Sequence, residues 1–309
     1  MARRRRQRVC AAAGATLAGE RAVTRRRCRQ QGLSLSELMV AMAVGLLLIL
    51  AACAVLLATR TSYLLNEDRA RLNETGRFAI DAISRAVRQA GYLDPSAMPA
   101  YAAAPPAVQG LDARGLKTST EGIAGPWQKA VNGSDVLALH FDGADDGGIL
   151  NCAGAAVPAG PDRGWSIFHV AEDARGEPEL RCKYRGASGW KSDAIARGVE
   201  SFQVLYGIDT EGDGLPHRYM TATAVDAAAP GGALWRTVAA IRIGLLVHGA
   251  ERARPGMRRL ALFGAEYARR HPEDAGAMVD EAMLPEAARG LARRIFTATI
   301  PLRNGSAAP

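Results

Sequence analysis

The chain has 309 residues, 48% of them hydrophobic, which allows one sizeable globular domain plus additional segments. Its formal net charge is +8, but residues 1–32 hold ten arginines and one acid, Glu20, and so carry +9. The remaining residues account for 8 minus 9, a net charge of −1, so we expect no nucleic-acid partner for the folded part.

A long uncharged run extends from Leu38 to Ala58, with the sequence LMVAMAVGLLLILAACAVLLA. As a helix, its 21 residues span about 31 Å, enough to cross the hydrocarbon core of a bilayer. Arginines precede this run and a long polar region follows it. The positive-inside rule therefore predicts a single-pass membrane protein, with residues 1–32 in the cytoplasm and the residues after about 60 across the membrane.

The stretch QGLSLSELMV, residues 31–40, joins the basic leader to this run. A secretory signal is cut after its apolar region, whereas Gly32 lies before it. Glu37 follows at the start of the apolar helix, where a carboxylate is costly and is expected to have a function. This order of basic leader, glycine, apolar residue and glutamate resembles the prepilin signal of type IV pilins and type II secretion pseudopilins. Such a signal implies that the membrane is the inner membrane and that the C-terminal domain lies in the periplasm.

The resemblance implies a processing step and an assembly step. A prepilin peptidase would cut between Gly32 and Leu33 and methylate the new amine, although pilins usually have Phe where this chain has Leu33. Glu37, the fifth mature residue, would then meet the corresponding amine of a neighbouring pilin and set the register of packing. The alternative is a glutamate that is solvated at the level of the lipid headgroups.

The helical pattern continues through residues 59–92. Apolar side chains recur there at spacings of three, four or seven, at Leu65, Leu72, Ala79, Ile83, Ala86 and Ala90. Oppositely charged pairs lie four residues apart at Glu67 with Arg71 and at Asp81 with Arg85. Gly76 interrupts the pattern and is expected to loosen it locally. We predict one helix of about 55 residues, with residues 33–58 in lipid or a fibre core and residues 59–92 packed on a globular domain.

Residues 93–309 predict a β-rich globular domain. Alanine, proline and glycine in residues 93–133 predict a long surface connection. Strand-like stretches follow at Asp135–Gly143, Trp165–Asp173, Glu179–Arg185, Val199–Asp209, His217–Val225, Thr237–Gly249 and Arg293–Asn304. No helices alternate with them, so we expect an antiparallel sheet and an α+β fold. The polar residues 251–290 predict an irregular or helical insertion.

Four stretches narrow the resemblance: ETGRFAIDAISRAVRQAGY, YGIDTEGDGLPHRYM, VAAIRIGLLV and RRIFTATIPLRN. Together they resemble the PilW family of type IV pilus assembly proteins, most strongly up to Tyr92, whereas residues 251–290 have no recognised counterpart. The resemblance implies a pilin-like fold and a low-abundance minor pilin that primes or caps pilus assembly with other minor and major pilins. A type II secretion pseudopilin and a membrane-anchored periplasmic sensor or binding module remain alternatives.

The five cysteines fall into three groups according to their position in the chain. Cys10 and Cys28 lie in the leader, and Cys53 lies in the apolar run as a small apolar residue. Cys152 and Cys182 are the two in the exported region, where an oxidising periplasm favours a disulfide. Closing this loop of about 31 residues would contribute roughly 3–4 kcal/mol in the chain-entropy model. The alternative is two buried free thiols, because proximity cannot be read from sequence.

Asp209, Glu211 and Asp213, followed by Gly214, resemble the first half of a calcium loop, with oxygen ligands at alternating positions. The twelfth position holds Met220, where a calcium loop needs a bidentate glutamate. Two interpretations therefore remain, a weak calcium site and an acidic hairpin turn between two strands.

Nothing in the sequence indicates a catalytic site. The five histidines are scattered without the spacing of metal ligands. Neither a G-x-S-x-G motif nor a phosphate-binding glycine loop occurs. We therefore expect a structural protein rather than an enzyme, with no cofactor other than a possible calcium ion.

Overall fold

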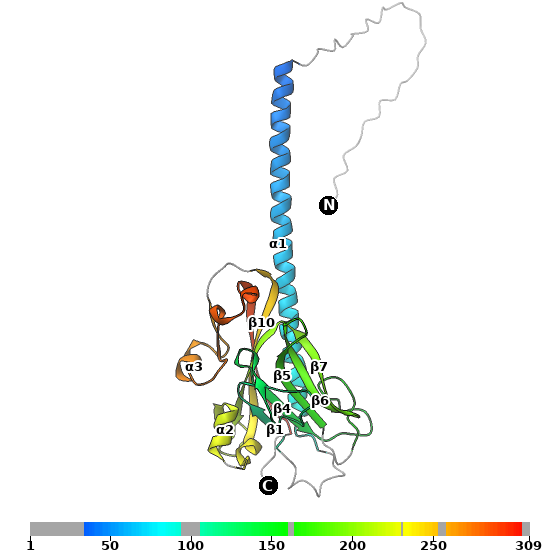
Figure 1. Cartoon of the computed structure of the whole chain (residues 1–309), viewed down its shortest axis with the longest axis vertical. Coiled ribbons are helices and arrows are strands. Elements are labelled where there is room, and N and C mark those ends of the chain that lie inside the picture. The colour runs from blue at the N-terminus through cyan, green and yellow to red at the C-terminus, as the bar shows by residue number, and fades with distance from the viewer. Residues whose placement is uncertain (1–33, 94–105, 160–163, 230, 253–257, 305–309) are drawn as a thin grey trace, which may run out of the picture. The chain divides into compact units, whose positions relative to one another are not determined.

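The computed structural model describes residues 34–93, 106–159, 164–229, 231–252 and 258–304 (Figure 1). Helix α1, Leu35–Gln89, is a single helix of 55 residues, as the sequence predicts. Up to Leu57 it forms one unit of the chain, and residues 58–309 form the other. In the first unit its side chains are exposed from Leu35 to Leu57, apart from the half-buried Gly45. By length and composition, α1 can cross a membrane.

The second half of α1 carries the predicted apolar stripe into the core of the larger unit. Leu72, Ala79, Ile83, Ala86 and Ala90 are buried, and Leu65 is half-buried. The two predicted i,i+4 ion pairs also form on this helix, Glu67 with Arg71 and Asp81 with Arg85. Each pair is largely exposed and contributes no more than about 0.5 kcal/mol, so burial of the stripe holds this half of the helix in place.

Two antiparallel sheets form the larger unit, where the sequence indicated one. The five-stranded sheet has the order β1 (Val108–Leu111), β4 (Val136–Phe141), β5 (Gly164–Glu172), β6 (Pro178–Gly186) and β7 (Gly189–Arg197). The four-stranded sheet has the order β13 (Leu291–Pro301), β10 (Val238–Arg252), β8 (Val199–Ile208) and β9 (Arg218–Met220). Short hairpins pair β2 (Arg114–Gly115) with β3 (Gln128–Lys129) and β11 (Arg259–Ala261) with β12 (Met278–Asp280).

The main core joins α1 to both sheets. Its buried side chains include Ile83 and Val87 of α1, Leu137 and Phe168 of the five-stranded sheet, and Phe202, Tyr206, Ile241 and Ile243 of the four-stranded sheet. Every residue of β4 and β8 is buried, so these strands have apolar neighbours on both faces. This double burial explains why β4, with the sequence VLALHF, shows almost no polar alternation.

The predicted strand His217–Val225 is wrong over its second half. Strand β9 ends at Met220, and helix α2, Ala222–Ala228, follows. Thr221 caps this helix by accepting the Ala224 N–H on its hydroxyl oxygen, 3.3 Å away. The carboxylate of Asp112 accepts the N–H groups of Ala222 and Thr223. A cap from a residue 110 positions away could not be read from the local pattern.

Residues 258–290 fold as a small layer on the four-stranded sheet, where the sequence suggested an irregular or helical insertion. It contains the β11–β12 hairpin, helix α3 (Ala265–Arg270) and the 3-10 turns η4 (Glu281–Met283) and η5 (Glu286–Ala288). Leu262, Val279 and Leu284 bury their side chains with Leu246 of β10. This small cluster explains why a mostly polar segment adopts a fixed fold.

A buried ion cluster fastens the same layer to the sheet. The Arg293 guanidinium, fully buried on β13, donates from Nε and Nη2 to the Glu200 carboxylate at 2.5 and 2.7 Å. It also donates from Nη1 to Glu281 of η4 at 2.9 Å. Because all three groups are buried, removal of one partner would leave an unpaired charge away from water, which costs about 3–5 kcal/mol.

Candidate functional site

The N-terminal end of α1 carries the predicted assembly residue. Ser34 precedes the helix, and its backbone N–H and hydroxyl donate to Glu37 Oε2 at 2.9 and 3.1 Å. In return, the Glu37 N–H donates to Ser34 Oγ at 3.3 Å. This reciprocal arrangement is a capping box, and the S-x-x-E spacing from Ser34 to Glu37 could have revealed it in the sequence. Gly32 and Leu33, the predicted processing site, lie outside the described residues.

Glu37 is therefore satisfied within its own helix and remains exposed. The sequence offered two interpretations, an assembly contact and a solvated bystander, and the structure adds a third. A carboxylate that caps the first turn stabilises the helix by roughly 1 kcal/mol or less at an exposed position. Because the capping interaction is weak, a cation from another chain could replace Ser34 as the partner of Glu37.

Cys152 and Cys182 form a disulfide with Cα atoms 5.8 Å apart. Cys182 lies fully buried on β6, and Cys152 lies in the loop between β4 and β5. The Cys152 N–H donates to the hydroxyl oxygen of Ser166 on β5 at 2.9 Å, which orients the loop beside the bridge. The pairing expected from the cysteine count is thus present, while Cys53 is a free, exposed cysteine of α1.

The acidic turn after β8 is organised by Asp209. Its Oδ1 accepts the N–H groups of Glu211 and Gly212, and its Oδ2 accepts the N–H of Gly214 at 2.8 Å. These bonds, led by the one from Gly214, lower the pKa of the Asp209 carboxyl. Both oxygens of this candidate calcium ligand are therefore engaged in shaping the turn. Met220, at the twelfth position, pairs with Tyr206 in the sheet and offers no carboxylate.

The structure adds His217 to this turn, which the sequence spacing did not suggest. Its Nε2 lies 3.6 Å from Asp213 Oδ2 and 3.7 Å from Glu211 Oε2, and its Nδ1 lies 3.8 Å from Asp209 Oδ1. Calcium takes six to eight oxygen ligands, and an imidazole nitrogen is a poor substitute. The residues present therefore fit a hydrogen-bonded acidic turn better than a calcium loop, and calcium binding stays a prediction.

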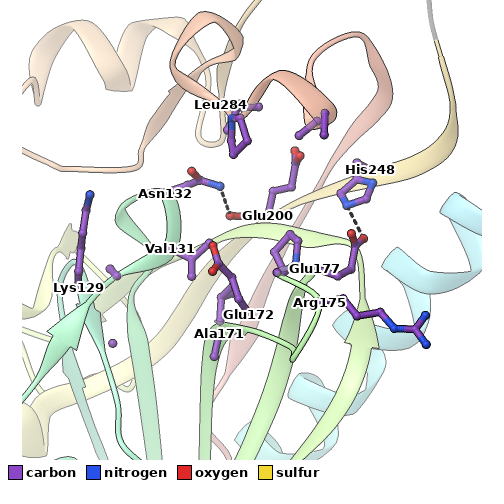
Figure 2. Close-up of a pocket in the computed structure, with 18 of the residues that line it drawn as sticks. Lys129, Val131, Asn132, Ala171, Glu172, Arg175, Glu177, Glu200, His248 and Leu284 are labelled. Carbon is purple, nitrogen blue, oxygen red and sulfur yellow. Dashed lines mark hydrogen bonds and ion pairs between the residues drawn. The ribbon is translucent and has the colours of Figure 1, made fainter.

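A cavity of about 750 Å³ lies between the strand ends and the segment that carries Leu284 (Figure 2). Val131, from the short turn η2 (Val131–Gly133), and Ala171 form apolar parts of its wall. On one side, His248 Nε2 lies 2.9 Å from Glu177 Oε1, and His248 Nδ1 lies 2.9 Å from the Gly249 carbonyl oxygen. Acidic and basic side chains are mixed in this lining, so its charge selects no ligand class.

Comparisons with known proteins match two parts of the chain. Residues 167–304 match the family described as Type IV Pilus-assembly protein W. Residues 27–52 match the prokaryotic N-terminal methylation motif, which includes Gly32, Leu33 and Glu37. The first match extends through residues 251–290, for which no counterpart was recognised in the sequence. No match was found among curated proteins.

Among solved structures, the chain is similar to a type IV-like pilin from Thermus thermophilus, with a TM-score of 0.37 and 15% sequence identity. The alignment covers 76% of this chain and 99% of that chain. The two sequence matches fall on the N-terminal helix and on the strands from β5 to β13. Over these residues the chain is similar to the PilW family and to the methylation motif, which supports a minor pilin of type IV pilus assembly.

Proposed function

We propose that the prepilin peptidase cuts this minor pilin between Gly32 and Leu33, and that the mature chain primes pilus assembly through Glu37. The observation that carries the proposal is the methylation motif placed directly on a capped, exposed apolar helix. Before processing, the basic leader keeps the N-terminus in the cytoplasm, and the C-terminal domain faces the periplasm. Removal of the leader leaves α1 as the membrane anchor.

In this proposal Glu37 has two partners in succession, first Ser34 of its own chain and then the amine of a neighbouring subunit. In the isolated chain its Oε2 accepts the N–H of Ser34. Cleavage creates a free amine at Leu33, and in a fibre a neighbouring subunit would bring its own amine to this carboxylate. An ion pair between the carboxylate and an ammonium group in an apolar environment is stronger than a hydrogen bond from a neutral N–H, so Glu37 would exchange Ser34 for the amine on packing. The capping box thus holds the carboxylate at the helix end until a partner arrives.

Intact-mass measurement of the membrane-extracted protein tests the processing step. The expected mass is that of a chain beginning at Leu33, with one added methyl group if the amine is methylated. Gly32→Leu should block cleavage because the bulky side chain obstructs the peptidase, whereas Gly45→Ala in the apolar helix should leave it intact. A mature protein that still begins at Met1 would favour a membrane-anchored sensor, which keeps its cytoplasmic tail.

A further inference from the structure

Arg242 lies on the outer face of the four-stranded sheet, beside the small layer that contains Leu262. On β10, Ile241 and Ile243 are buried in the main core, so the side chain of Arg242 between them faces the other side of the sheet. In register, Arg242 lies opposite Thr299 of β13 and Leu205 of β8. A lone charge here has no role in the packing of the core.

The guanidinium of Arg242 is held in a fixed orientation. Its central carbon lies 4.1 Å from the centre of the Tyr219 ring, and its Nε–H donates to Thr299 Oγ1 at 3.3 Å. Within the described part of the chain, no Asp or Glu oxygen forms an ion pair with it. Stacking and the Nε bond engage one face and one edge of the group, which leaves the edge with the two terminal nitrogens available to a ligand.

This arginine borders a cavity of about 440 Å³ between β13 and the segment 262–264. The hydroxyls of Thr297 and Thr299, two positions apart on β13, lie on the same side of the strand as Arg242. Phe263 supplies an apolar wall. The backbone of β10 is close here because Gly244 has no side chain: a Cβ on it would lie 3.1 Å from Leu262 Cβ.

We propose that this cavity binds the carboxylate of a small hydroxylated ligand, of the sugar-acid class. The planar fork of an oriented guanidinium matches the two oxygens of a carboxylate. The two threonine hydroxyls can bond to ligand hydroxyls, and Phe263 adds apolar surface for the carbons of a sugar ring. The cavity has one cation among its lining residues, which suits a monoanion and gives a phosphate dianion too little charge.

Titration of the full chain in detergent with sodium glucuronate, followed by NMR or calorimetry, tests the proposal. Glucose, with the same ring and no carboxylate, should bind at least tenfold more weakly, and inorganic phosphate should not compete. Arg242→Gln should weaken glucuronate binding roughly tenfold or more, and Arg242→Lys should weaken it too, because the planar fork is lost. Arg218 is an exposed arginine on β9 of the same sheet, and Arg218→Gln removes the same charge and should leave binding unchanged.

The source of the carboxylate is tested with a uronate trisaccharide. Tighter binding than the monosaccharide assigns the site to an acidic polysaccharide, and equal binding assigns it to a free sugar acid. If Arg242→Gln lowers the melting temperature, the variants Thr297→Val and Thr299→Val replace it and should each weaken binding. The proposal is overturned if glucuronate does not bind, if glucose or phosphate binds equally well, or if the folded Arg242 and threonine variants retain wild-type affinity.

Discussion

Phe296 of β13 lies against Gly76 of α1 so closely that a Cβ on Gly76 would stand 2.2 Å from the ring carbon Cε2. The sequence suggested that Gly76 loosens the helix, but α1 continues through it, and the glycine instead makes room for the aromatic ring. In an exposed helix, Gly→Ala stabilises by about 0.5–1 kcal/mol, whereas overpacking a core costs about 1–3 kcal/mol. At Gly76 the cost of overpacking against Phe296 should exceed the gain in helix stability.

We therefore expect Gly76→Ala to lower the free energy of unfolding by about 1–2 kcal/mol, measured by chemical denaturation. Gly45→Ala, at a helical glycine where a Cβ meets nothing within 4 Å, is the matched control and should not destabilise. A double variant that also carries Phe296→Leu should recover part of the loss. Equal stability of Gly76→Ala and the wild type would show that the ring moves aside freely.

Glu37→Ala should separate processing from assembly. Cleavage after Gly32 should survive because the scissile bond is unchanged, and co-purification with partner pilins should fail. The loss of a counter-charge for a buried amine costs about 3–5 kcal/mol, which is far more than the stability that the helix cap contributes. Glu37→Gln keeps an acceptor and should show a smaller defect.

Two controls identify which role of Glu37 matters. Ser34→Ala breaks the capping box but keeps the carboxylate, so it should cost about 1 kcal/mol of helix stability and leave pili on the cell surface. Glu67→Ala removes an exposed acid from the same helix and should be neutral. Normal pili with Glu37→Ala would show that the glutamate is only a helix cap.

Removal of the Cys152–Cys182 disulfide should destabilise the larger unit by about 3–4 kcal/mol, because the bridge closes a loop with a sequence separation of 30. Cys152→Ser with Cys182→Ser, compared with the wild type by thermal unfolding, measures this loss. Cys53→Ser is the control, since this exposed cysteine of α1 has no disulfide partner. Free thiols at both positions in periplasmic material would contradict the pairing.

His169 should make stability depend on pH. Burial, with help from the positive charges of Arg181 and Lys183, lowers its pKa from 6.5 to about 4. Because the folded state resists protonation, its contribution is complete above pH 6.5 and is lost as the pH falls towards 4, by about 3 kcal/mol in total. Urea unfolding between pH 7 and 4 should show a shallower decline for His169→Gln.

The acids of the chain are the same in the wild type and in His169→Gln, so the difference between the two slopes isolates His169. Identical slopes for the wild type and His169→Gln would mean that the imidazole is protonated as readily in the folded state as in the unfolded state.

The sequence predicted those parts of the fold whose pattern is local. The apolar stripe and the acidic–basic pairs of α1 repeat at helical spacing, and β5 and β8 each match a predicted strand to within one residue at either end. Strand β7 was missed because it lies at a sheet edge and is mostly polar. Its place in the sheet is set by its pairing with β6, which the local sequence does not show. Strand β1 was missed inside the presumed connection of residues 93–133.

The same distinction, between features with a local sequence pattern and features without one, applies to the site residues. Glu37 stood out because a carboxylate beside an apolar run is costly, and its cap from Ser34 is a local motif. By contrast, His217 approaches Asp209 only because β9 folds back on β8, and Arg242 meets Tyr219 across the same sheet. The hairpin that brings His217 to Asp209 was one interpretation of the sequence, but the contact of Arg242 with Tyr219 depends on strand order, for which one sequence carries no direct signal.

The contact between Gly76 and Phe296 also bears on the order in which the protein is made. The α1 stripe emerges from the ribosome before β13, which packs on it, because Arg294 of β13 follows Asn73 of α1 with a sequence separation of 221. Asn73 accepts a hydrogen bond from Arg294, and Asn304 donates to the carbonyls of Arg88 and Ala90, so the two ends of the larger unit close on each other. Until β13 has been made, this side of α1 lacks its cover and remains available to chaperones or to another pilin.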